Sequence, residues 1–227
     1  MNQARFPKLL YLLILFVLVA CQAQAATPPA PTAVPPPAAT AAPATAVPAT
    51  AAAQALTTFS SKTYKLHMGI TFGPANWNVI DDYPDLVTLL KMREQIGDEL
   101  GFNIVTDAKL ADPVDGHLVP FPNDFVAWVK SDPDFIAGEA TEVMVGGIKG
   151  MQIDARTKTT EKKDYLHLAG GTIWYVNAPS GTLTWRFILL NDVNGERVLI
   201  TFDPPSDKFD SAMAAAQKIL DSVVFRP

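Results

Sequence analysis

Cysteine is almost absent from this chain of 227 residues, which contains only Cys21. A single thiol excludes a framework of intramolecular disulfides and a metal site built from several thiolates. Histidine is scarce as well. The three histidines, His67, His117 and His167, lie 50 residues apart, and none forms a helical zinc-binding pair. We interpret each as a surface histidine. Because a single thiol is too few for a disulfide framework or for a metal site of several thiolates, the folded part must depend on its hydrophobic core.

Charge is missing from much of the N-terminal quarter. After Arg5 and Lys8, no charged residue occurs before Lys62, and residues 9–19 are an uninterrupted apolar run. A short basic region, an apolar run and small residues follow one another in export signals. A helix of eleven residues rises about 16 Å, whereas the hydrocarbon core of a membrane requires roughly 20 residues. The run is therefore too short for a transmembrane anchor.

The only cysteine lies directly after this apolar run. The sequence Leu-Val-Ala-Cys that ends at Cys21 resembles the lipobox of bacterial lipoproteins. The resemblance implies a diacylglycerol on Cys21 and cleavage before it, so that residues 1–20 form a signal peptide. Two or three acyl chains, at roughly 0.8 kcal/mol per buried methylene, make a stable membrane anchor. The alternative is an ordinary secretory signal in which Cys21 has no special role.

A linker follows the cysteine. Residues 22–56 are almost wholly alanine, proline and threonine. Such a segment cannot bury enough apolar surface to offset its ordering entropy. We predict a disordered tether over residues 21–58, with a reach of order 100 Å at about 3.1 Å per residue. This places the folded domain on the extracytoplasmic side of the cell membrane, held there by the lipid on Cys21.

The mature chain is mildly acidic. Removal of the signal peptide leaves 16 basic and 23 acidic residues, a net charge of about −7. This charge argues against nucleic acid or an anionic lipid surface as a partner. About 170 residues remain for the folded part, which is enough for one domain and short for two. We expect one monomeric domain over residues 59–227.

Hydrophobic periodicity predicts mainly strands. Apolar and polar residues alternate from Tyr64 to Phe72, which is typical of a half-buried strand. Asn194 and Gly195 favour a type I′ hairpin turn between apolar segments at 185–190 and 197–202. Continuous apolar arms of this kind indicate central strands that are covered on both faces. Other apolar runs predict strands over 77–80, 102–105, 143–145 and 151–155, and a helix or a strand over 86–92.

Two helices are predicted as well. Asn123 and Asp124 precede a short apolar periodicity that Pro133 ends. Ser206 or Asp207 is expected to cap a final helix. The apolar stripe of that helix comprises Phe209, Met213, Ala216, Leu220 and Val223. The sequence therefore predicts an α+β domain, an antiparallel sheet with helices packed against it.

Three stretches of this domain carry a family resemblance. Residues 122–128, 145–150 and 219–225 resemble those of bacterial extracytoplasmic lipoproteins, whose folded part is similar to the PsbP/Mog1-like α/β/α sandwich. The resemblance extends over about residues 59–225. It implies that fold and an accessory role, and it supplies no catalytic residue.

Acidic and histidine side chains offer one candidate cation site. Asp112, Asp115 and His117 occur in one loop, but they lack the ligand number and spacing of a calcium loop. We therefore interpret them as residues whose side chains hydrogen-bond to the backbone of a turn, and we predict no metal site.

Catalytic motifs are absent from the sequence as well. No Gly-x-Ser-x-Gly motif occurs, and Ser180 is interpreted as a loop serine. Asp98 and Glu99 are adjacent, which directs their carboxylates apart on a strand.

Aromatic residues offer the remaining candidate. Trp174, Tyr175 and Trp185 lie on neighbouring segments and are a possible platform for a sugar or an apolar ligand, with core packing as the alternative. We predict a binding or accessory module without catalytic residues or cofactor, whose protein or small-molecule partner is unknown. An assembly factor that docks on a membrane protein complex is the alternative. A hydrolase with an unrecognised site is a third hypothesis.

Overall fold

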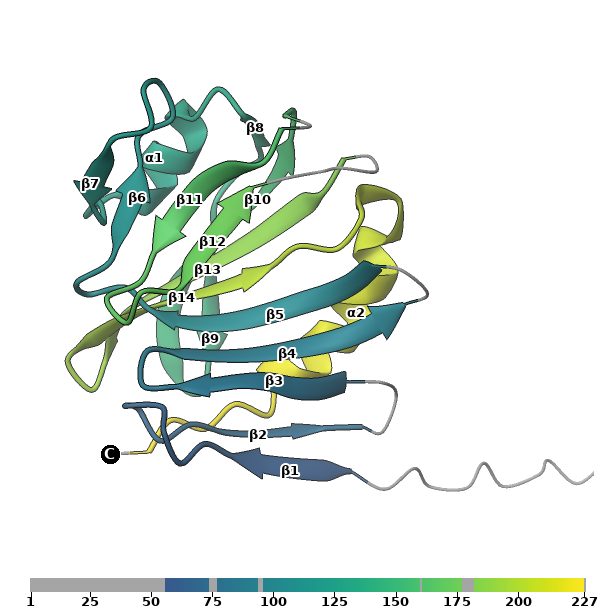
Figure 1. Ribbon diagram of the computed structural model, residues 1–227. Helices are drawn as coiled ribbons and strands as arrows, with labels where there is room; N and C mark the ends of the chain where they lie inside the picture. Colours follow the sequence, from purple (N-terminus) through teal and green to yellow (C-terminus); the bar gives the residue numbers. More distant parts are fainter. Residues whose placement is uncertain (1–55, 74–76, 94–95, 160, 177–181, 227) are drawn as a thin grey trace, which may run out of the picture. The chain divides into compact units, whose positions relative to one another are not determined.

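A computed structural model describes residues 56–226 except 74–76, 94–95, 160 and 177–181 (Figure 1). The predicted signal peptide, Cys21, almost all of the tether and Ser180 lie outside these residues. Within the described part of the chain, no helix is long and apolar enough to cross a membrane.

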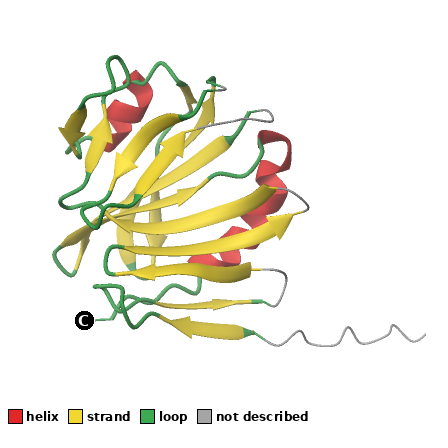
Figure 2. Ribbon diagram, viewed as in Figure 1, coloured by secondary structure: helices red, strands yellow, loops and turns green. Residues whose placement is uncertain are grey.

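The main sheet is antiparallel and has eight strands (Figure 2). Seven follow the order β3 (Trp77–Tyr83), β4 (Leu86–Arg93), β5 (Ile96–Ile104), β14 (Glu196–Phe202), β13 (Thr184–Val193), β10 (Ile148–Thr157) and β8 (Phe135–Ala137). The eighth, β9 (Thr141–Val145), also pairs with β10. The segment at 86–92, which the sequence left ambiguous, is therefore a strand.

Two smaller sheets accompany the main sheet. One pairs β1 (Thr57–Ser60) with β2 (Gly69–Phe72). The other has the order β12 (Ile173–Val176), β11 (Lys163–His167), β6 (Lys109–Ala111) and β7 (Leu118–Pro120). The helices are α1 (Phe125–Ser131) and α2 (Phe209–Leu220), and a 3-10 turn at Ser206–Lys208 precedes α2.

The predicted hairpin is confirmed. Asn194 and Gly195 have φ angles of 53° and 87°, the left-handed values that a type I′ turn requires. Leu189 and Leu199 face each other across the two arms, and both are buried. Strand β14 lies between β5 and β13 in the sheet, which explains the apolar character of its residues on both faces.

Two hydrophobic clusters lie on opposite faces of the main sheet. Helix α2 packs on one face, where Ala212, Met213 and Ile219 join the first cluster. The small four-stranded sheet and α1 contribute the covering residues of the second cluster, such as Leu110, Phe125 and Leu166. Helices therefore pack against an antiparallel sheet, which confirms the predicted α+β class. The second covering layer consists mainly of sheet, with one short helix.

The segment from Tyr64 to Phe72 differs from the sequence prediction. Tyr64, Leu66 and Met68 are buried as the alternation indicates, but the strand begins only at Gly69. His67 has a φ of 45°, and its backbone N–H donates to the carbonyl of Tyr64 at 2.9 Å. Alternate burial is thus achieved by a chain of turns, which period-two patterning does not distinguish from a strand.

One of the two predicted helix caps is present in the structure. The Asp124 carboxylate caps α1, accepting a hydrogen bond of 2.9 Å from the backbone N–H of Ala127. Helix α2, by contrast, has no side-chain cap, so the prediction of Ser206 or Asp207 as its cap is wrong. The hydroxyl of Ser206 instead lies 2.7 Å from that of Thr184 and joins the 3-10 turn to β13.

Candidate functional site

An open cleft of about 590 Å³ lies at one end of the main sheet. The β3–β4 turn, the end of β5, the start of β14 and the β11–β12 turn meet there. Its lining comprises Lys65, Tyr83, Pro84, Asp85, Ile104, Asp107, Ala169, Gly170, Gly171, Thr172 and Glu196. This volume is within the range typical of small-molecule sites. The cleft is therefore a candidate binding site in the described part of the chain.

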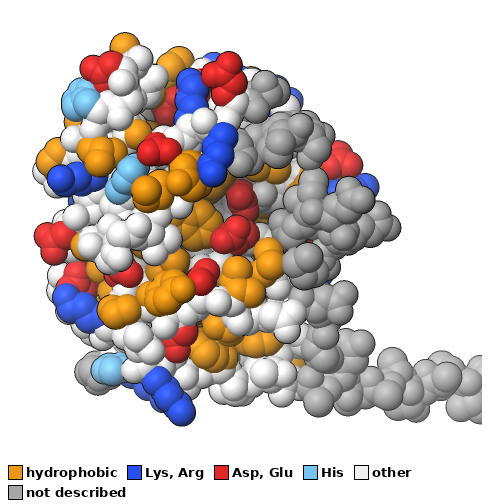
Figure 3. All heavy atoms as spheres, in the orientation of Figure 1, with side chains coloured by type: hydrophobic (Ala, Val, Ile, Leu, Met, Phe, Trp, Pro, Cys, Tyr) orange, Lys and Arg blue, Asp and Glu red, His pale blue; other side chains and the backbone are white. Residues whose placement is uncertain are grey.

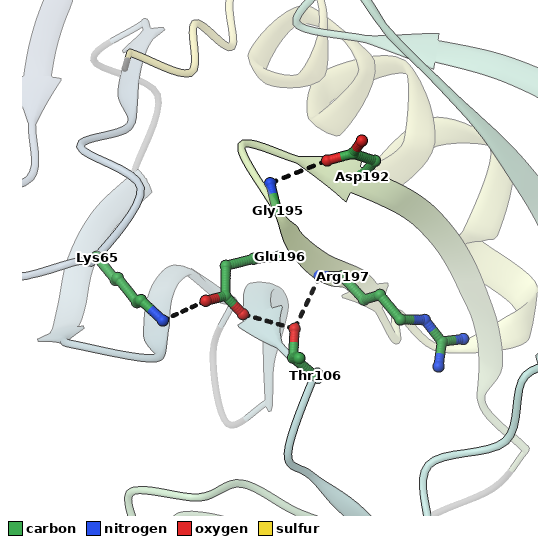
Figure 4. A network of polar contacts seen from close by, with 6 residues as sticks. All are labelled: Lys65, Thr106, Asp192, Gly195, Glu196 and Arg197. Atoms are coloured by element: carbon green, nitrogen blue, oxygen red, sulfur yellow. Dashed lines mark hydrogen bonds and ion pairs between the residues drawn. The ribbon is translucent and has the colours of Figure 1, made fainter.

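A network of polar contacts forms one wall of the cleft (Figure 4). The Lys65 ammonium pairs with one carboxylate oxygen of Glu196. The hydroxyl of Thr106 donates to the other oxygen at 2.5 Å and accepts a hydrogen bond of 2.9 Å from the backbone N–H of Arg197. The three side chains come from the segment before β2, from the segment after β5 and from β14. The network therefore joins three distant parts of the sequence.

These contacts also set the protonation states of the pair. Hydrogen bonds from Lys65 and Thr106 lower the pKa of Glu196, whose side chain is only 13% exposed. The hydrogen bond to Glu196 raises the pKa of Lys65. Each group is therefore held in its charged form at neutral pH. Since a general acid or base works best with a pKa near the working pH, the pair is suited to binding rather than to proton transfer.

Asp85 in the β3–β4 turn fixes another part of the cleft lining. Its carboxylate accepts a hydrogen bond of 2.6 Å from the backbone N–H of Gly170 in the β11–β12 turn. A Cβ atom at Gly170 would lie 2.7 Å from that carboxylate oxygen, so a larger residue there would displace the Asp85 carboxylate. The carbonyl of Asp85 also accepts a hydrogen bond of 2.9 Å from the backbone N–H of Ile104. The small sheet is thereby tied to the main sheet across the cleft.

Two of the three residues of the predicted aromatic platform are buried. Trp185 is 1% exposed and Trp174 is 9% exposed, and both belong to the second hydrophobic cluster. The Trp185 ring stacks on Phe187 with centroids 5.4 Å apart. A Cβ atom at Gly101 would lie 2.8 Å from the indole of Trp174, which shows how closely that ring covers the main sheet. The two rings therefore pack in the core, the alternative that the sequence left open.

Tyr175, the third residue of the predicted platform, is partly exposed. Its ring lies under the Lys162 ammonium, which is 3.5 Å from the ring centroid. A cation–π contact of this kind occupies the ring face that would otherwise receive a ligand. Tyr175 therefore does not form a shared surface with the two buried tryptophans.

The candidate cation loop is brought together by the fold. Ligand atoms of Asp112, Asp115 and His117 lie within 4.8 Å of one another. Asp112 accepts a hydrogen bond of 2.8 Å from the backbone N–H of Val114, and Asp115 accepts one of 3.1 Å from that of His117. The His117 ring also pairs with Asp115, which lowers the pKa of Asp115 and raises that of His117. Hydrogen bonds from the backbone to side chains two residues away are typical of turns, which is the interpretation that the sequence favours.

The histidines and the glycines near residue 146 lie outside the cleft. His67 and His117 are exposed, and the partly buried His167 lies 3.3 Å from the Asp164 carboxylate. Gly146 and Gly147 form the β9–β10 turn, with φ angles of 59° and 80°.

Sequence reasoning missed a pair of carboxyl groups on the main sheet. Glu99 lies on the same strand face as Gly101, which the Trp174 ring covers. Burial and the charge of Asp81 raise the pKa of Glu99 to about 7. Burial and the charge of Glu99 raise the pKa of Asp203, whose carboxylate accepts a hydrogen bond from the backbone N–H of Glu99. Figure 3 shows acidic side chains among hydrophobic ones on this face.

Sequence spacing gave no signal for this pair. The register that joins Leu100 to Phe202 brings Glu99 close to Asp203 from a distant part of the chain. Asp98, its sequence neighbour, points to the opposite face and is fully buried. Only the strand order could have revealed the pairing.

The fold and the cleft define an antiparallel α+β protein with an open, charged cleft. No known protein family matches the sequence, and no curated protein matches it either. Solved structures give weak likenesses. A protein of Bacteroides thetaiotaomicron is 10% identical over 75% of this chain, with a TM-score of 0.41, and the chain spans only 48% of its length.

Two further solved structures match over most of their own length. LpqN, involved in cell envelope biogenesis of Mycobacterium tuberculosis, is 12% identical with a TM-score of 0.42, over 76% of this chain and 92% of its own. The cyanobacterial PsbP of Synechocystis is 14% identical with a TM-score of 0.41, over 75% of this chain and 92% of its own.

Proposed function

We propose that this protein is a lipid-anchored extracytoplasmic binding module without catalytic activity. The lipobox-like sequence at Cys21 and the uncharged segment after it support the anchor and the tether. The cleft at the end of the main sheet is the binding site of the module. The observation that carries this proposal is the Lys65–Glu196 pair, whose hydrogen bonds hold both groups in their charged forms.

The chemistry of the cleft favours a cationic ligand. Asp85, Asp107 and Glu196 line it together with a single ammonium, that of Lys65. Asp107 is exposed on the cleft wall and is available to a ligand. Tyr83, which is 50% exposed, offers an aromatic surface beside the carboxylates. An amine or guanidinium attached to a flat or apolar group fits this combination.

A matched pair of probes tests this proposal. Arginine amide carries a guanidinium, and citrulline amide replaces that cation by a neutral urea of nearly the same shape. Calorimetry on the mature protein should show binding of arginine amide at least tenfold tighter than that of citrulline amide. Asp107→Asn should weaken only the cationic probe, because it removes a negative charge that attracts the guanidinium and not the neutral urea.

A distant carboxylate supplies the control. Asp210 lies on the exposed side of α2 and does not line the cleft. Asp210→Asn should leave both affinities unchanged. Equal binding of the two probes, or no difference between the two aspartate variants, would contradict a cationic ligand in this cleft.

A further inference from the structure

A second concavity lies between α2 and the ends of β2, β3 and β4. It has a volume of about 420 Å³. Its lining comprises Leu56, Thr71, Phe72, Gly73, Trp77, Lys91, Ala215, Lys218, Ile219 and Ser222. We call it the α2 groove. Leu56 is the first residue that the structure describes and lies near the end of the predicted tether, so the groove opens beside the start of the domain.

The α2 groove has the opposite charge to the cleft. Among the residues that the structure describes, Lys91 and Lys218 are the charged ones in its lining, whereas carboxylates predominate in the cleft. Within the described part of the chain, neither lysine has an ion-pair partner. Asp98 faces Lys91 in the β4–β5 register, but it is fully buried and does not line the groove. Two ammonium groups are thus available to an anion at the groove.

Apolar side chains supply most of the remaining surface, together with Thr71 and Ser222. Phe72, Trp77 and Ile219 are each less than one tenth exposed and belong to the first hydrophobic cluster, so the floor of the groove is rigid. Leu56, by contrast, is 71% exposed at the groove. Because water contact with a large apolar side chain is unfavourable, an apolar ligand that covers Leu56 and the floor is stabilised.

We propose that the α2 groove binds a single-chain anionic amphiphile of the fatty-acid type. The acyl chain lies over Trp77 and against Leu56, and the carboxylate is held by Lys91 and Lys218. Charge complementarity selects this occupant, since a neutral or cationic head group leaves both ammonium groups without a counterion. The net acidity of the chain disfavours anionic surfaces in general, but the lining of this groove is locally basic. The site is separate from the cleft and does not depend on the proposed function.

The test uses the compact unit Ala51–Pro227, because both hydrophobic clusters consist of residues within it. Dodecanoate, decanoate and dodecyltrimethylammonium are titrated below their micellar concentrations by calorimetry. One dodecanoate should bind per protein. Burial of a methylene contributes about 0.8 kcal/mol, so decanoate, shorter by two, should bind about 15-fold more weakly. The cationic amphiphile should bind at least tenfold more weakly than dodecanoate.

Three variants separate the groove from non-specific binding. Lys218→Glu should weaken dodecanoate at least tenfold while the unfolding temperature changes little, because Lys218 is exposed. Lys208→Glu, at the other end of α2 and outside the groove, is the matched control and should bind as the parent does. Ala215→Phe places a ring in the groove and should abolish binding without changing its charge.

Two results would overturn the proposal. One is equal binding of anionic and cationic amphiphiles that Lys218→Glu does not change, which would indicate simple detergent association. The other is binding to phosphatidylglycerol vesicles without binding of monomeric dodecanoate, which would indicate a membrane surface as the occupant.

Discussion

The carboxylate of Asp85 and the backbone N–H of Gly170 are 2.6 Å apart and join two different sheets. Asp85 lies in the β3–β4 turn of the main sheet, and Gly170 lies in the β11–β12 turn of the small sheet. The cleft is the space that these turns enclose with the Lys65–Glu196 pair. Its shape therefore depends on a contact between residues far apart in the sequence.

Loss of this contact should loosen the cleft. We expect Asp85→Ala to lower the free energy of unfolding by about 1.5–3 kcal/mol, the usual contribution of a hydrogen bond to a charged group. Binding of arginine amide should weaken as well. Urea denaturation measures the first effect and calorimetry the second. Glu142→Ala, at an exposed position of β9 outside the cleft, is the control, and equal midpoints for the two variants would contradict this role for Asp85.

The centre of the main sheet should not accept a charge. Leu199 lies on β14, is fully buried and belongs to the second cluster. Leu199→Asp should abolish folding, because a buried unpaired charge costs several kcal/mol against a total stability of roughly 5–15 kcal/mol. Circular dichroism and thermal melting measure this. Val114→Asp at a site 88% exposed should melt within a few degrees of the parent. A Leu199→Asp variant that melts like the parent would contradict the position of β14.

The carboxyl group of Glu99 should make stability depend on pH. Its pKa is about 7 in the folded protein, against 4.5 for an unperturbed glutamate. Between these values the folded state keeps a proton that the unfolded state releases, so stability falls as pH rises from about 4.5 to 7. Glu99→Gln should weaken this dependence, because only the raised pKa of Asp203 then contributes to it at this site, and should stabilise the protein at pH 8 by about 1–3 kcal/mol.

Urea denaturation at pH 4.5, 6 and 8 tests this dependence. Glu142→Gln, on an exposed residue of β9, is the control and should keep the parent's slope. If Glu99→Gln has the same slope as the parent, the carboxyl group of Glu99 is not the source of the dependence.

The proposed lipid anchor predicts the N-terminus and the mass of the mature protein. The native protein should begin at Cys21 and carry a diacylglycerol with or without a third acyl chain. Cys21→Ser should remain uncleaved by the lipoprotein peptidase, because the lipidated cysteine is its substrate. Intact-mass spectrometry of membrane extracts measures both. A mature N-terminus elsewhere, with Cys21 as a free thiol, would contradict the anchor.

Local features of the fold were predictable from the sequence. The Asn194–Gly195 turn and the Asp124 cap depend on residues within a few positions of one another, and both are present. The short strands of the small sheet left weaker signals, because three-residue strands such as β6 and β7 show little periodicity. The layer that covers the second face was therefore predicted only as helix.

The candidate site could not have been predicted in the same way. Lys65, Asp85, Gly170 and Glu196 meet only because of strand order and register, which periodicity does not specify. The tryptophans show the same limit. Trp174 and Trp185 lie on strands of different sheets, and which ring faces solvent depends on how those sheets pack.

Nuclear magnetic resonance tests most directly whether the cleft is a binding site. Backbone amide shifts of the mature protein are followed during titration with arginine amide and, separately, with citrulline amide. We predict saturable shifts for Gly170, Gly171, Thr172 and Asp107 with the cationic probe, and little change with the neutral one. Shifts of equal size with both probes, or shifts concentrated away from these residues, would contradict the cleft as the binding site.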